Sequence, residues 1–248
     1  MPHWKHAIVV GASSGIGAAI AEALAADGTR VALVARRIDV LSTLAERLNT
    51  SAGQVLARTY SSDVTEIETI PSLFAEITQD LDGLDLIIYA AGTMPRIGPG
   101  EYNTEKDAEM IAANFTGAVA WLNEAASRFE KAGSGTIVGI SSVAGDRGRR
   151  GSPVYGATKA ALNTYLESLR NRIERRGAFV VTIKPGPVDT PMTHGLKMPG
   201  MISAERAAAE ILLAAKDQVR IAYVPAKWKP IMAVICAIPA PLFKWLNI

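Results

Sequence analysis

The chain has 248 residues and a nearly balanced charge, with 26 Lys and Arg against 24 Asp and Glu. A net charge of +2 without a long run of like charges offers no electrostatic footprint for nucleic acid, so we expect no nucleic-acid partner. The single Cys236 excludes an internal disulfide, and three histidines plus this cysteine, none at ligand spacing, predict no metal site.

The first six residues run straight into an apolar segment, residues 7–10, without the hydrophobic core of a signal peptide. This start predicts a cytoplasmic protein. The length suits one large α/β domain that buries about three quarters of its unfolded surface. We expect that domain over residues 1–226, followed by an apolar extension, residues 227–248, that docks on the same domain or on a partner.

A glycine-rich turn follows the first apolar segment. Gly11, Gly15 and Gly17 separate it from a helical pattern that starts at Ala18. Glycines allow a tight turn and a close backbone approach, and the amides at a helix start can bind a pyrophosphate. The glycine spacing reverses the common Gly-x-Gly-x-x-Gly dinucleotide fingerprint, so a flexible loop is the alternative. The strand before and the helix after favour a dinucleotide site.

The end of the second predicted strand, residues 31–35, bears on the choice of cofactor. An acidic residue about 20 positions after the glycines would accept the ribose 2′-hydroxyl of NAD. Here that position is Ala35, and Arg36 and Arg37 follow it. Two guanidinium groups can bind a 2′-phosphate through charge-assisted hydrogen bonds, which favours NADPH. The alternative is two solvated arginines at the start of a helix.

Apolar strand candidates alternate with helical patterns along the chain. Near-continuous apolar strands separated by crossover-length helices predict seven parallel strands covered on both faces, with the ligand at their carboxyl ends. Gly11, Gly92, Ser142 and Pro185 follow the first, fourth, fifth and sixth strands and should therefore meet at one edge. The seven candidates are residues 7–10, 31–35, 55–60, 86–90, 136–141, 179–183 and 221–224.

Residues 104–131 predict a long helix with an apolar face formed by Ile111, Phe115, Val119 and Leu122. This helix either packs against a partner subunit or only covers the sheet.

Tyr155 and Lys159 lie four positions apart, which places a phenol and an ammonium group on one helix face. Tyrosine titrates near pH ~10, and an adjacent cation favours the phenolate and makes the phenol a usable proton donor. The pair alone is weak evidence, because the same spacing occurs by chance in surface helices.

The motifs taken together resemble the short-chain dehydrogenase/reductase family in order and separation over nearly the whole chain. These motifs are Gly11-x-x-x-Gly15-x-Gly17, Ala90-Ala91-Gly92, Asn114, Ser142, Tyr155-x-x-x-Lys159 and the segment from Pro185 to Thr190. The resemblance implies a single-domain, Rossmann-like doubly wound α/β fold. One departure is Tyr89-Ala90-Ala91-Gly92, where the family usually has Asn-Asn-Ala-Gly, so an amide that braces the central strand is missing.

The resemblance also implies roles for single residues. Tyr155 would donate the proton, Lys159 would lower its pKa and bind the nicotinamide ribose, and Ser142 would orient the substrate oxygen. Ser141 is the rival serine, but only Ser142 has the family's separation of 13 residues from Tyr155. Asn114 resembles the residue whose backbone distortion holds a water that joins Lys159 to solvent. A polar side chain facing solvent is the alternative.

The resemblance implies a nicotinamide dinucleotide with Asp63 at the adenine, and Ala35, Arg36 and Arg37 make NADP(H) the expected form. The residues expected to bind it are Gly11, Ser13, Ser14, Gly15, Ile16, Gly17, Arg36, Arg37, Asp63, Val64, Ala91, Gly92, Tyr155, Lys159, Pro185, Gly186, Val188 and Thr190.

Two segments are expected near the substrate. Residues 145–151 carry three arginines, which either attract an anionic substrate or, as we expect, belong to a solvated loop. Residues 191–203 predict a short lid in which Met192, Met198 and Met201 form an apolar, tolerant pocket.

The extension 227–248 is too short and too interrupted by prolines to span a bilayer. Its apolar residues between Lys and Trp suit a peripheral membrane contact, but they also suit a helix over the cleft or a subunit interface, which we favour.

We therefore expect an NADPH-dependent carbonyl reductase or alcohol dehydrogenase that acts on a fairly apolar substrate as a homodimer or homotetramer. A non-catalytic NADP-binding redox sensor and a reductase of lipid-like or carrier-bound acyl groups are the alternatives.

Overall fold

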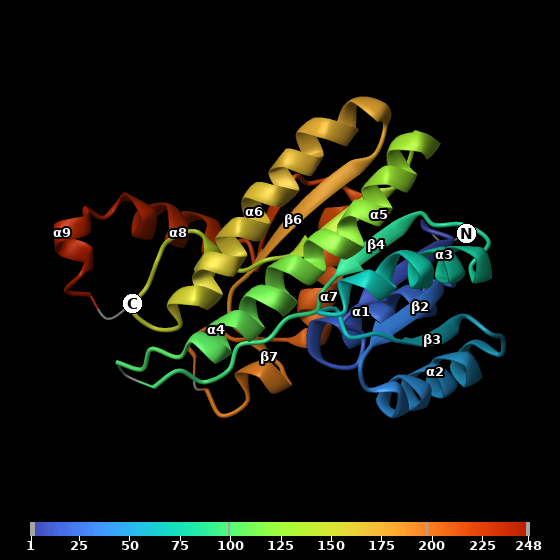
Figure 1. Ribbon diagram of the computed structural model, residues 1–248, viewed down its shortest axis with the longest axis horizontal. Coiled ribbons are helices and arrows are strands. Elements are labelled where there is room, and N and C mark those ends of the chain that lie inside the picture. Colours follow the sequence, from blue (N-terminus) through green and yellow to red (C-terminus); the bar gives the residue numbers. More distant parts are fainter. Residues whose placement is uncertain (1–2, 99, 197, 247–248) are drawn as a thin grey trace.

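The computed structural model describes residues 3–98, 100–196 and 198–246, and a parallel β-sheet forms its centre (Figure 1). Within these residues the sheet has seven strands in the order β3-β2-β1-β4-β5-β6-β9, and all neighbours are parallel. The prediction of a single, doubly wound α/β domain is confirmed. The strands are β1 (His6–Val10), β2 (Arg30–Ala35), β3 (Ala57–Ser61), β4 (Leu86–Tyr89), β5 (Thr136–Ile140), β6 (Phe179–Pro185) and β9 (Ile221–Val224).

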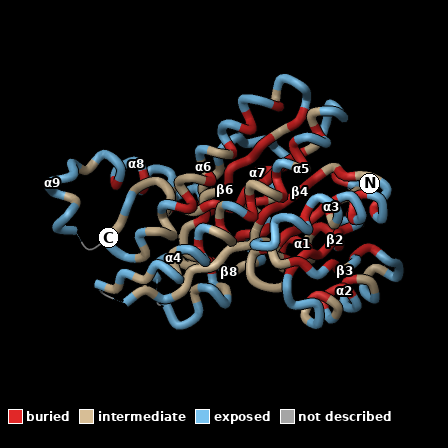
Figure 2. The backbone as a smooth tube through the Cα atoms, in the orientation of Figure 1, coloured by how far each residue is buried: buried red, intermediate tan, exposed pale blue. Residues whose placement is uncertain are grey.

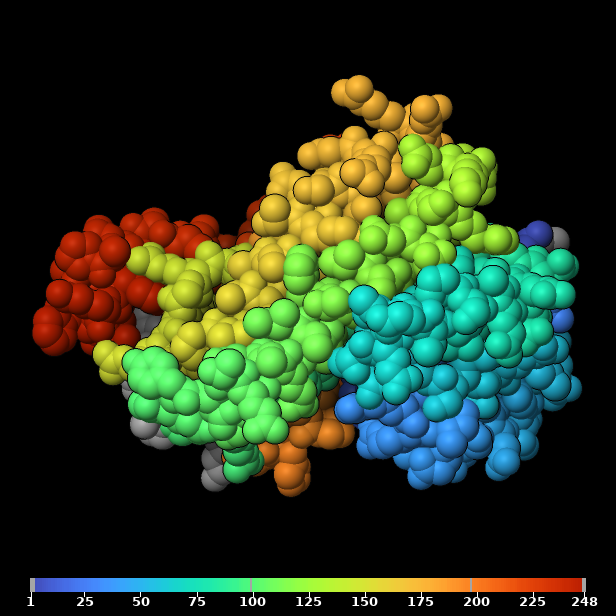
Figure 3. All heavy atoms as spheres, in the orientation of Figure 1, coloured from blue at the N-terminus to red at the C-terminus, as the bar shows by residue number. Residues whose placement is uncertain are grey.

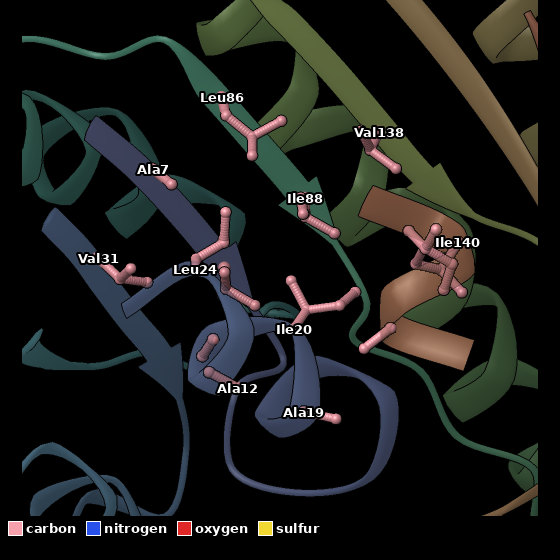
Figure 4. Packing of buried hydrophobic residues seen from close by; sticks show 14 of the residues in the cluster. Ala7, Ala12, Ala19, Ile20, Leu24, Val31, Leu86, Ile88, Val138 and Ile140 are labelled. Carbon is pink, nitrogen blue, oxygen red and sulfur yellow. The ribbon is translucent and has the colours of Figure 1, made fainter. Parts of the chain in front are cut away.

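Helices cover both faces of the sheet because side chains alternate along each strand. Val9 points into a core shared with α1 and α7, whereas its neighbour Ile8 points into a second core shared with α3, α5 and α6. Figure 4 shows the first core, where Ile20 and Leu24 of α1 face Ile88 of the sheet. The helices are α1 (Gly15–Ala26), α2 (Ile38–Ala52), α3 (Ile70–Asp80), α5 (Gly117–Ala132), α6 (Pro153–Ile173) and α7 (Ala204–Lys216).

The third strand begins later than predicted. The side-chain oxygen of Asn49 accepts hydrogen bonds from the amides of Leu56 and Ala57, at 2.8 and 2.7 Å, and so holds the chain at the strand entrance. Val55 is left 63% exposed and outside the strand. Two short strands that the sequence did not reveal, β7 (Val188–Asp189) and β8 (Ile202–Ser203), pair in parallel beside the main sheet.

The predicted long helix is interrupted in the middle. It consists of α4 (Thr104–Ile111), a π-helical turn at Ala112–Thr116, and α5, which ends at Gly133 in the left-handed conformation. Asn103 caps the start of α4 by accepting a hydrogen bond from the amide of Lys106 at 3.1 Å. A π turn widens a helix locally and often marks a functional position, and here Asn114 lies at its centre.

Residues 228–246 follow the last strand and form what we call the arm. It contains α8 (Trp228–Ala237) and α9 (Ala240–Phe243) and extends from the body beside the start of α6 (Figure 1). Figure 2 shows that the arm is largely exposed, in contrast to the buried strands. No helix among the described residues is both long enough and apolar enough to cross a membrane.

Candidate functional site

Loops at the carboxyl ends of the strands enclose a cleft of about 430 Å³. This is the edge at which a doubly wound sheet binds its ligands. Every residue for which a cofactor contact was expected lines the cleft, although the eighteen come from segments far apart in the chain. Among them are the glycine-rich turn, the arginines after β2, Asp63 after β3, and Tyr155 and Lys159 on α6.

The cleft also includes residues that the sequence analysis did not single out. The amide of Thr93, directly after Gly92, donates to Asn114, and its hydroxyl lies 3.2 Å from a carboxylate oxygen of Glu109. The residues without an expected role are Ser62, Thr65, Thr93, Glu109, Ala113 and Ile140.

The glycine-rich turn brings three segments of backbone close together. A Cβ atom on Gly11 would lie 2.5 Å from the amide nitrogen of Ala91, and Gly11 has a φ of +92° that favours glycine. A Cβ atom on Gly17 would lie 2.2 Å from the carbonyl oxygen of Gly11. The glycines therefore permit the close packing of the loops after β1 and β4, so a flexible loop no longer explains them.

The two arginines after β2 line one end of the cleft. Arg37 donates to the hydroxyls of Ser13 and Ser14 at 2.9 and 3.0 Å, which ties the second strand to the glycine-rich turn. Arg36 lies 3.7 Å from the carboxylate of Asp63 and keeps an exposed side chain. Neither arginine is simply solvated, and the two guanidinium groups make this end of the cleft positive.

Asp63 is held as a carboxylate at the same end of the cleft. Burial alone would raise its pKa, but hydrogen bonds from the amide and hydroxyl of Thr65, at 2.9 and 2.8 Å, and the charge of Arg36 together lower the pKa below its ordinary value. The carboxylate is therefore an acceptor at neutral pH.

The two adjacent serines after β5 have different surroundings. Ser141 is buried, and its hydroxyl donates to the carbonyl of Lys159 at 3.1 Å. Ser142 is half-buried, and its hydroxyl accepts from the amide of Ala144 at 3.1 Å while facing the cleft near Tyr155. Ser141 is thus committed to the packing of α6, which leaves Ser142 as the hydroxyl available to a ligand.

Tyr155 and Lys159 occupy the first turns of α6 and both line the cleft. Burial raises the pKa of Tyr155, and hydrogen bonding to Ser142 lowers it only in part. The Nζ atom of Lys159 lies 5.8 Å from the centre of the Tyr155 ring and donates to the carbonyl of Ile140 at 2.9 Å.

Burial therefore outweighs any lowering of the Tyr155 pKa by Lys159, and the pKa of the phenol lies above its ordinary value. The cause is the burial of both groups, because removal from water disfavours each charged form. Burial also lowers the pKa of Lys159 itself, from 10.5 to about 8. At neutral pH, Tyr155 is a protonated phenol beside a buried ammonium group.

Asn114 is completely buried, so the alternative of a solvent-facing side chain is wrong. Its side-chain oxygen accepts from the amide of Thr93 at 2.7 Å, and its nitrogen donates to the carbonyl of Thr93 at 3.0 Å. The same nitrogen lies 3.3 Å from the hydroxyl of Thr158, next to Lys159 in α6. Asn114 therefore joins the loop after β4 to the helix that carries Tyr155 and Lys159, but it does not line the cleft itself.

Tyr89 replaces the missing amide at the end of the central strand. Its side chain is completely buried, and its hydroxyl donates to the carbonyl of Ala113 at 2.6 Å. Ala113 lies in the π turn, immediately before Asn114. The departure from the family pattern thus introduces a different brace, one that holds the distorted turn of the long helix.

The expected lid only partly faces the cleft. Thr190 caps a short helical turn, Pro191–Thr193, and the methyl carbon of Thr190 would lie 3.0 Å from a Cβ atom on Gly15 across the cleft. Met192 lines the cleft, but Met198 and Met201 do not, so the prediction of a pocket built from three methionines is wrong. Pairing of β7 with β8 turns the segment away from the cleft after residue 193. Residue 197 lies outside the described residues.

The arginines of residues 145–151 neither face the cleft nor form a solvated loop, so both expectations for them are wrong. Arg147 donates to the carbonyls of Ile235 and Cys236 at 2.6 and 3.0 Å and lies 3.9 Å above the Phe243 ring. Arg150 donates to the carbonyl of Lys244 at 3.1 Å. The loop is therefore the seat of the arm, as the contact of the red and yellow-green atoms in Figure 3 illustrates.

The apolar part of the contact between the arm and the body lies next to the cleft. Met232 and Ile235 of α8 pack against Val143, which directly follows Ser142. The indole of Trp228 lies against Gly186, where a Cβ atom would come within 2.0 Å of the indole nitrogen. Both Ser142 and Gly186 line the cleft, so the arm supports two of its walls from behind.

Sequence comparisons place this geometry in a known family. A family model described as short chain dehydrogenase matches residues 5–199. An uncharacterized oxidoreductase of Mycobacterium tuberculosis is 31% identical over 240 residues, which cover 95% of this chain and 94% of that protein. An uncharacterized oxidoreductase of Staphylococcus epidermidis is 37% identical over 191 residues, or 77% of this chain and 81% of that protein.

A comparison with solved structures agrees. A short-chain dehydrogenase from Sphingobium yanoikuyae in complex with NADPH matches with a TM-score of 0.82 and 25% identity, over 97% of both chains. The family match covers most of the chain, and the mycobacterial relative covers nearly all of it. The chain belongs to the short-chain dehydrogenase/reductase family of oxidoreductases.

Proposed function

We propose that this protein is an NADP(H)-dependent carbonyl reductase or alcohol dehydrogenase that acts on a fairly apolar ketone or secondary alcohol, with Tyr155 as the general acid and base. The observation that carries the proposal is the shared cleft, in which Ser142, Tyr155 and Lys159 line the same cavity as the glycine-rich turn and Arg36. A redox sensor without activity would need the glycine-rich turn but not the serine, tyrosine and lysine together.

The residues of the cleft fit a dinucleotide. The hydroxyl oxygen of Ser62, beside Asp63, is buried without a hydrogen-bond partner among the described residues, and it lines the cleft. The amides that open α1 have no side-chain cap from Ser14 and face the same cavity. Unmatched polar groups of this kind suit a ligand rich in hydroxyl and phosphate oxygens. Bound NADPH would supply the hydride.

The side chains have distinct tasks in this proposal. Ser142 donates a hydrogen bond to the substrate oxygen and polarises the carbonyl group. Tyr155 transfers its phenolic proton to that oxygen as negative charge develops there. Lys159 holds the ribose hydroxyls and offers a cation beside Tyr155 when the phenol loses its proton. Ala113 and Met192 provide apolar surface at the substrate end of the cleft.

The raised pKa of Tyr155 bears on how the rates of reduction and oxidation depend on pH. Because burial keeps the phenol protonated at neutral pH, the proton donor needed for ketone reduction is present there. Alcohol oxidation needs the phenolate, so its rate should increase as the pH rises above neutrality.

The test is Tyr155→Phe, which removes the proton donor and keeps the ring. We expect ketone reduction to fall by about 10²–10⁴-fold, the usual contribution of a general acid, with NADPH binding nearly unchanged in fluorescence titration. Tyr165→Phe, on the same helix but outside the cleft, is the matched control and should retain activity. Wild-type turnover in Tyr155→Phe would exclude this role.

The cofactor preference has its own test. Ala35 offers no acceptor for a 2′-hydroxyl, whereas Arg36 and Arg37 supply donors, so kcat/KM should be at least about tenfold higher with NADPH than with NADH. Ala35→Asp combined with Arg36→Ser should shift the preference toward NADH. Equal efficiencies in the wild-type enzyme would rule out a phosphate clamp.

We extend the proposal to assembly as a homodimer or homotetramer through α5 and α6. Phe115, in the π turn before α5, and Tyr165, on α6, meet edge to face and remain partly exposed, and Ile111 at the end of α4 is 46% exposed. Light scattering of the purified protein measures the mass. A monomer at micromolar concentration would reject this part.

A further inference from the structure

The arm presents a second, apolar side that its seat does not cover. Residues 230–243 contain no charged side chain. While Met232 and Ile235 face the body, Val234 is 67% exposed and Leu242 60% exposed. Trp245, at the end of the arm, is 78% exposed. An apolar helical surface of this kind marks a binding surface, because its contact with water is unfavourable.

The charges around this surface have one sign. No Asp or Glu occurs between residues 221 and 248, where Lys227, Lys229 and Lys244 supply three positive charges. The whole chain has a net charge of +2, so the remaining residues carry a net charge of −1. The cations are thus concentrated where the apolar surface is exposed.

We propose that the arm binds the surface of an anionic phospholipid bilayer, with α8 and α9 lying in the interface. Apolar side chains flanked by Lys and Trp suit the membrane–water interface. The polar ends of the lysines and tryptophans remain among the headgroups, while the lysine stems, the indole rings and the apolar side chains enter the acyl region. The described part of the arm is too short to cross the membrane, so it lies on one leaflet.

A second copy of this chain is the competing occupant, and the charge pattern argues against it. A two-fold interface would place the same surface on both sides and bring Lys227, Lys229 and Lys244 toward their own copies. Among the arm residues no carboxylate is available to offset that repulsion, whereas an anionic bilayer supplies negative charge across the whole contact.

The experiment is co-sedimentation of the full-length protein with two kinds of vesicle, phosphatidylcholine alone and phosphatidylcholine mixed with phosphatidylglycerol. We expect binding to the mixed vesicles that weakens at high salt, because salt screens the lysines. Val234→Asp should lower the partition coefficient about tenfold or more, because it places a charge on the apolar face. Lys229→Gln combined with Lys244→Gln should weaken binding to the mixed vesicles only.

Val55→Asp is the matched control, since Val55 is 63% exposed at the entrance to β3 and far from the arm in the fold. It should bind vesicles as the wild type does, and both valine variants should keep wild-type kcat/KM with a water-soluble ketone. The proposal is overturned if the wild type fails to sediment with the mixed vesicles, if both valine variants lose binding equally, or if neutral vesicles bind as well. It is also overturned if Val234→Asp only lowers the oligomeric mass in light scattering.

Discussion

Two lysines have side chains that are largely shielded from water, and their surroundings differ sharply. Lys159 is 5% exposed and donates to the carbonyl of Ile140, and no carboxylate of the described residues forms an ion pair with it. The side chain of Lys184, beneath the seat of the arm, lies 2.6 Å from Asp146. The other carboxylate oxygen of Asp146 accepts from the hydroxyl of Tyr223 at 2.8 Å.

The difference separates a functional charge from a structural one. A buried cation with a carboxylate partner and further hydrogen bonds recovers much of its lost hydration, whereas one facing only a carbonyl does not. The lowered pKa of Lys159, about 8, is the signature of that uncompensated cost. A fold keeps such a residue where chemistry requires it, and Lys159 lies in the cleft while Lys184 does not.

The strongest test of this comparison is Lys159→Met. We expect kcat/KM for ketone reduction to fall about 10³-fold, because a residue with two proposed tasks is lost. The free energy of unfolding at pH 7 should nevertheless rise by up to about 3 kcal/mol, since lowering the pKa from 10.5 to about 8 costs roughly that much while the ammonium is charged. Urea unfolding measures the second effect, and a variant less stable than the wild type would contradict the comparison.

Lys184→Met should have the opposite profile. It leaves the carboxylate of Asp146 buried without its cation, so the protein should lose about 3 kcal/mol of stability. The folded fraction should keep its turnover. Combining Lys184→Met with Asp146→Asn removes the stranded charge and should restore part of the loss, a coupling that a double-mutant cycle in urea would measure. Additive losses would mean that the ion pair contributes nothing.

The pH dependence of stability sharpens the contrast further. The pKa of Lys159 is about 8 in the folded protein and 10.5 ordinarily, so between these values the unfolded chain binds more protons and stability rises with pH. The advantage of Lys159→Met over the wild type should therefore shrink between pH 8 and 10.5. Ionisation of the buried tyrosines other than Tyr155 cancels in this difference, because both proteins contain them and Lys159 is not beside them. An advantage that is constant over this range would show that Lys159 is not desolvated.

The sequence was sufficient to predict the fold and the eighteen expected cofactor contacts that line the cleft, for a physical reason. Strand periodicity and the glycine-rich turn are local signals, and in a parallel sheet the carboxyl ends of the strands meet at one edge. Gly11, Gly92, Ser142 and Pro185 could thus be brought together without coordinates.

The errors arose where a distant segment decides the outcome. The arginines of residues 145–151 look like a solvated loop locally, but the carbonyls that Arg147 binds lie almost 90 residues away in α8, and Arg150 binds the carbonyl of Lys244. The pKa of Tyr155 depends on how deeply α6 is buried, which the spacing to Lys159 does not report. The π turn at Asn114 required knowledge of Tyr89, on a strand packed against the helix.

The smallest effect belongs to Tyr89→Phe, which tests whether the central strand holds the site in place. Removing the Tyr89 hydroxyl deletes its hydrogen bond to the carbonyl of Ala113, and the fully buried ring of the variant offers that carbonyl no other donor. The free energy of unfolding should therefore fall by about 1 kcal/mol. Because Asn114 follows Ala113 directly and reaches toward α6 through Thr158, a relaxed π turn should also lower kcat several-fold without changing KM for NADPH.

Tyr165→Phe is the control. The hydroxyl of Tyr165, on α6, donates a hydrogen bond to the side chain of Asn123, on α5, at 2.8 Å. This variant should lose comparable stability and no kcat, and an equal drop in kcat for both variants would show that Tyr89 stabilises the fold without positioning the site.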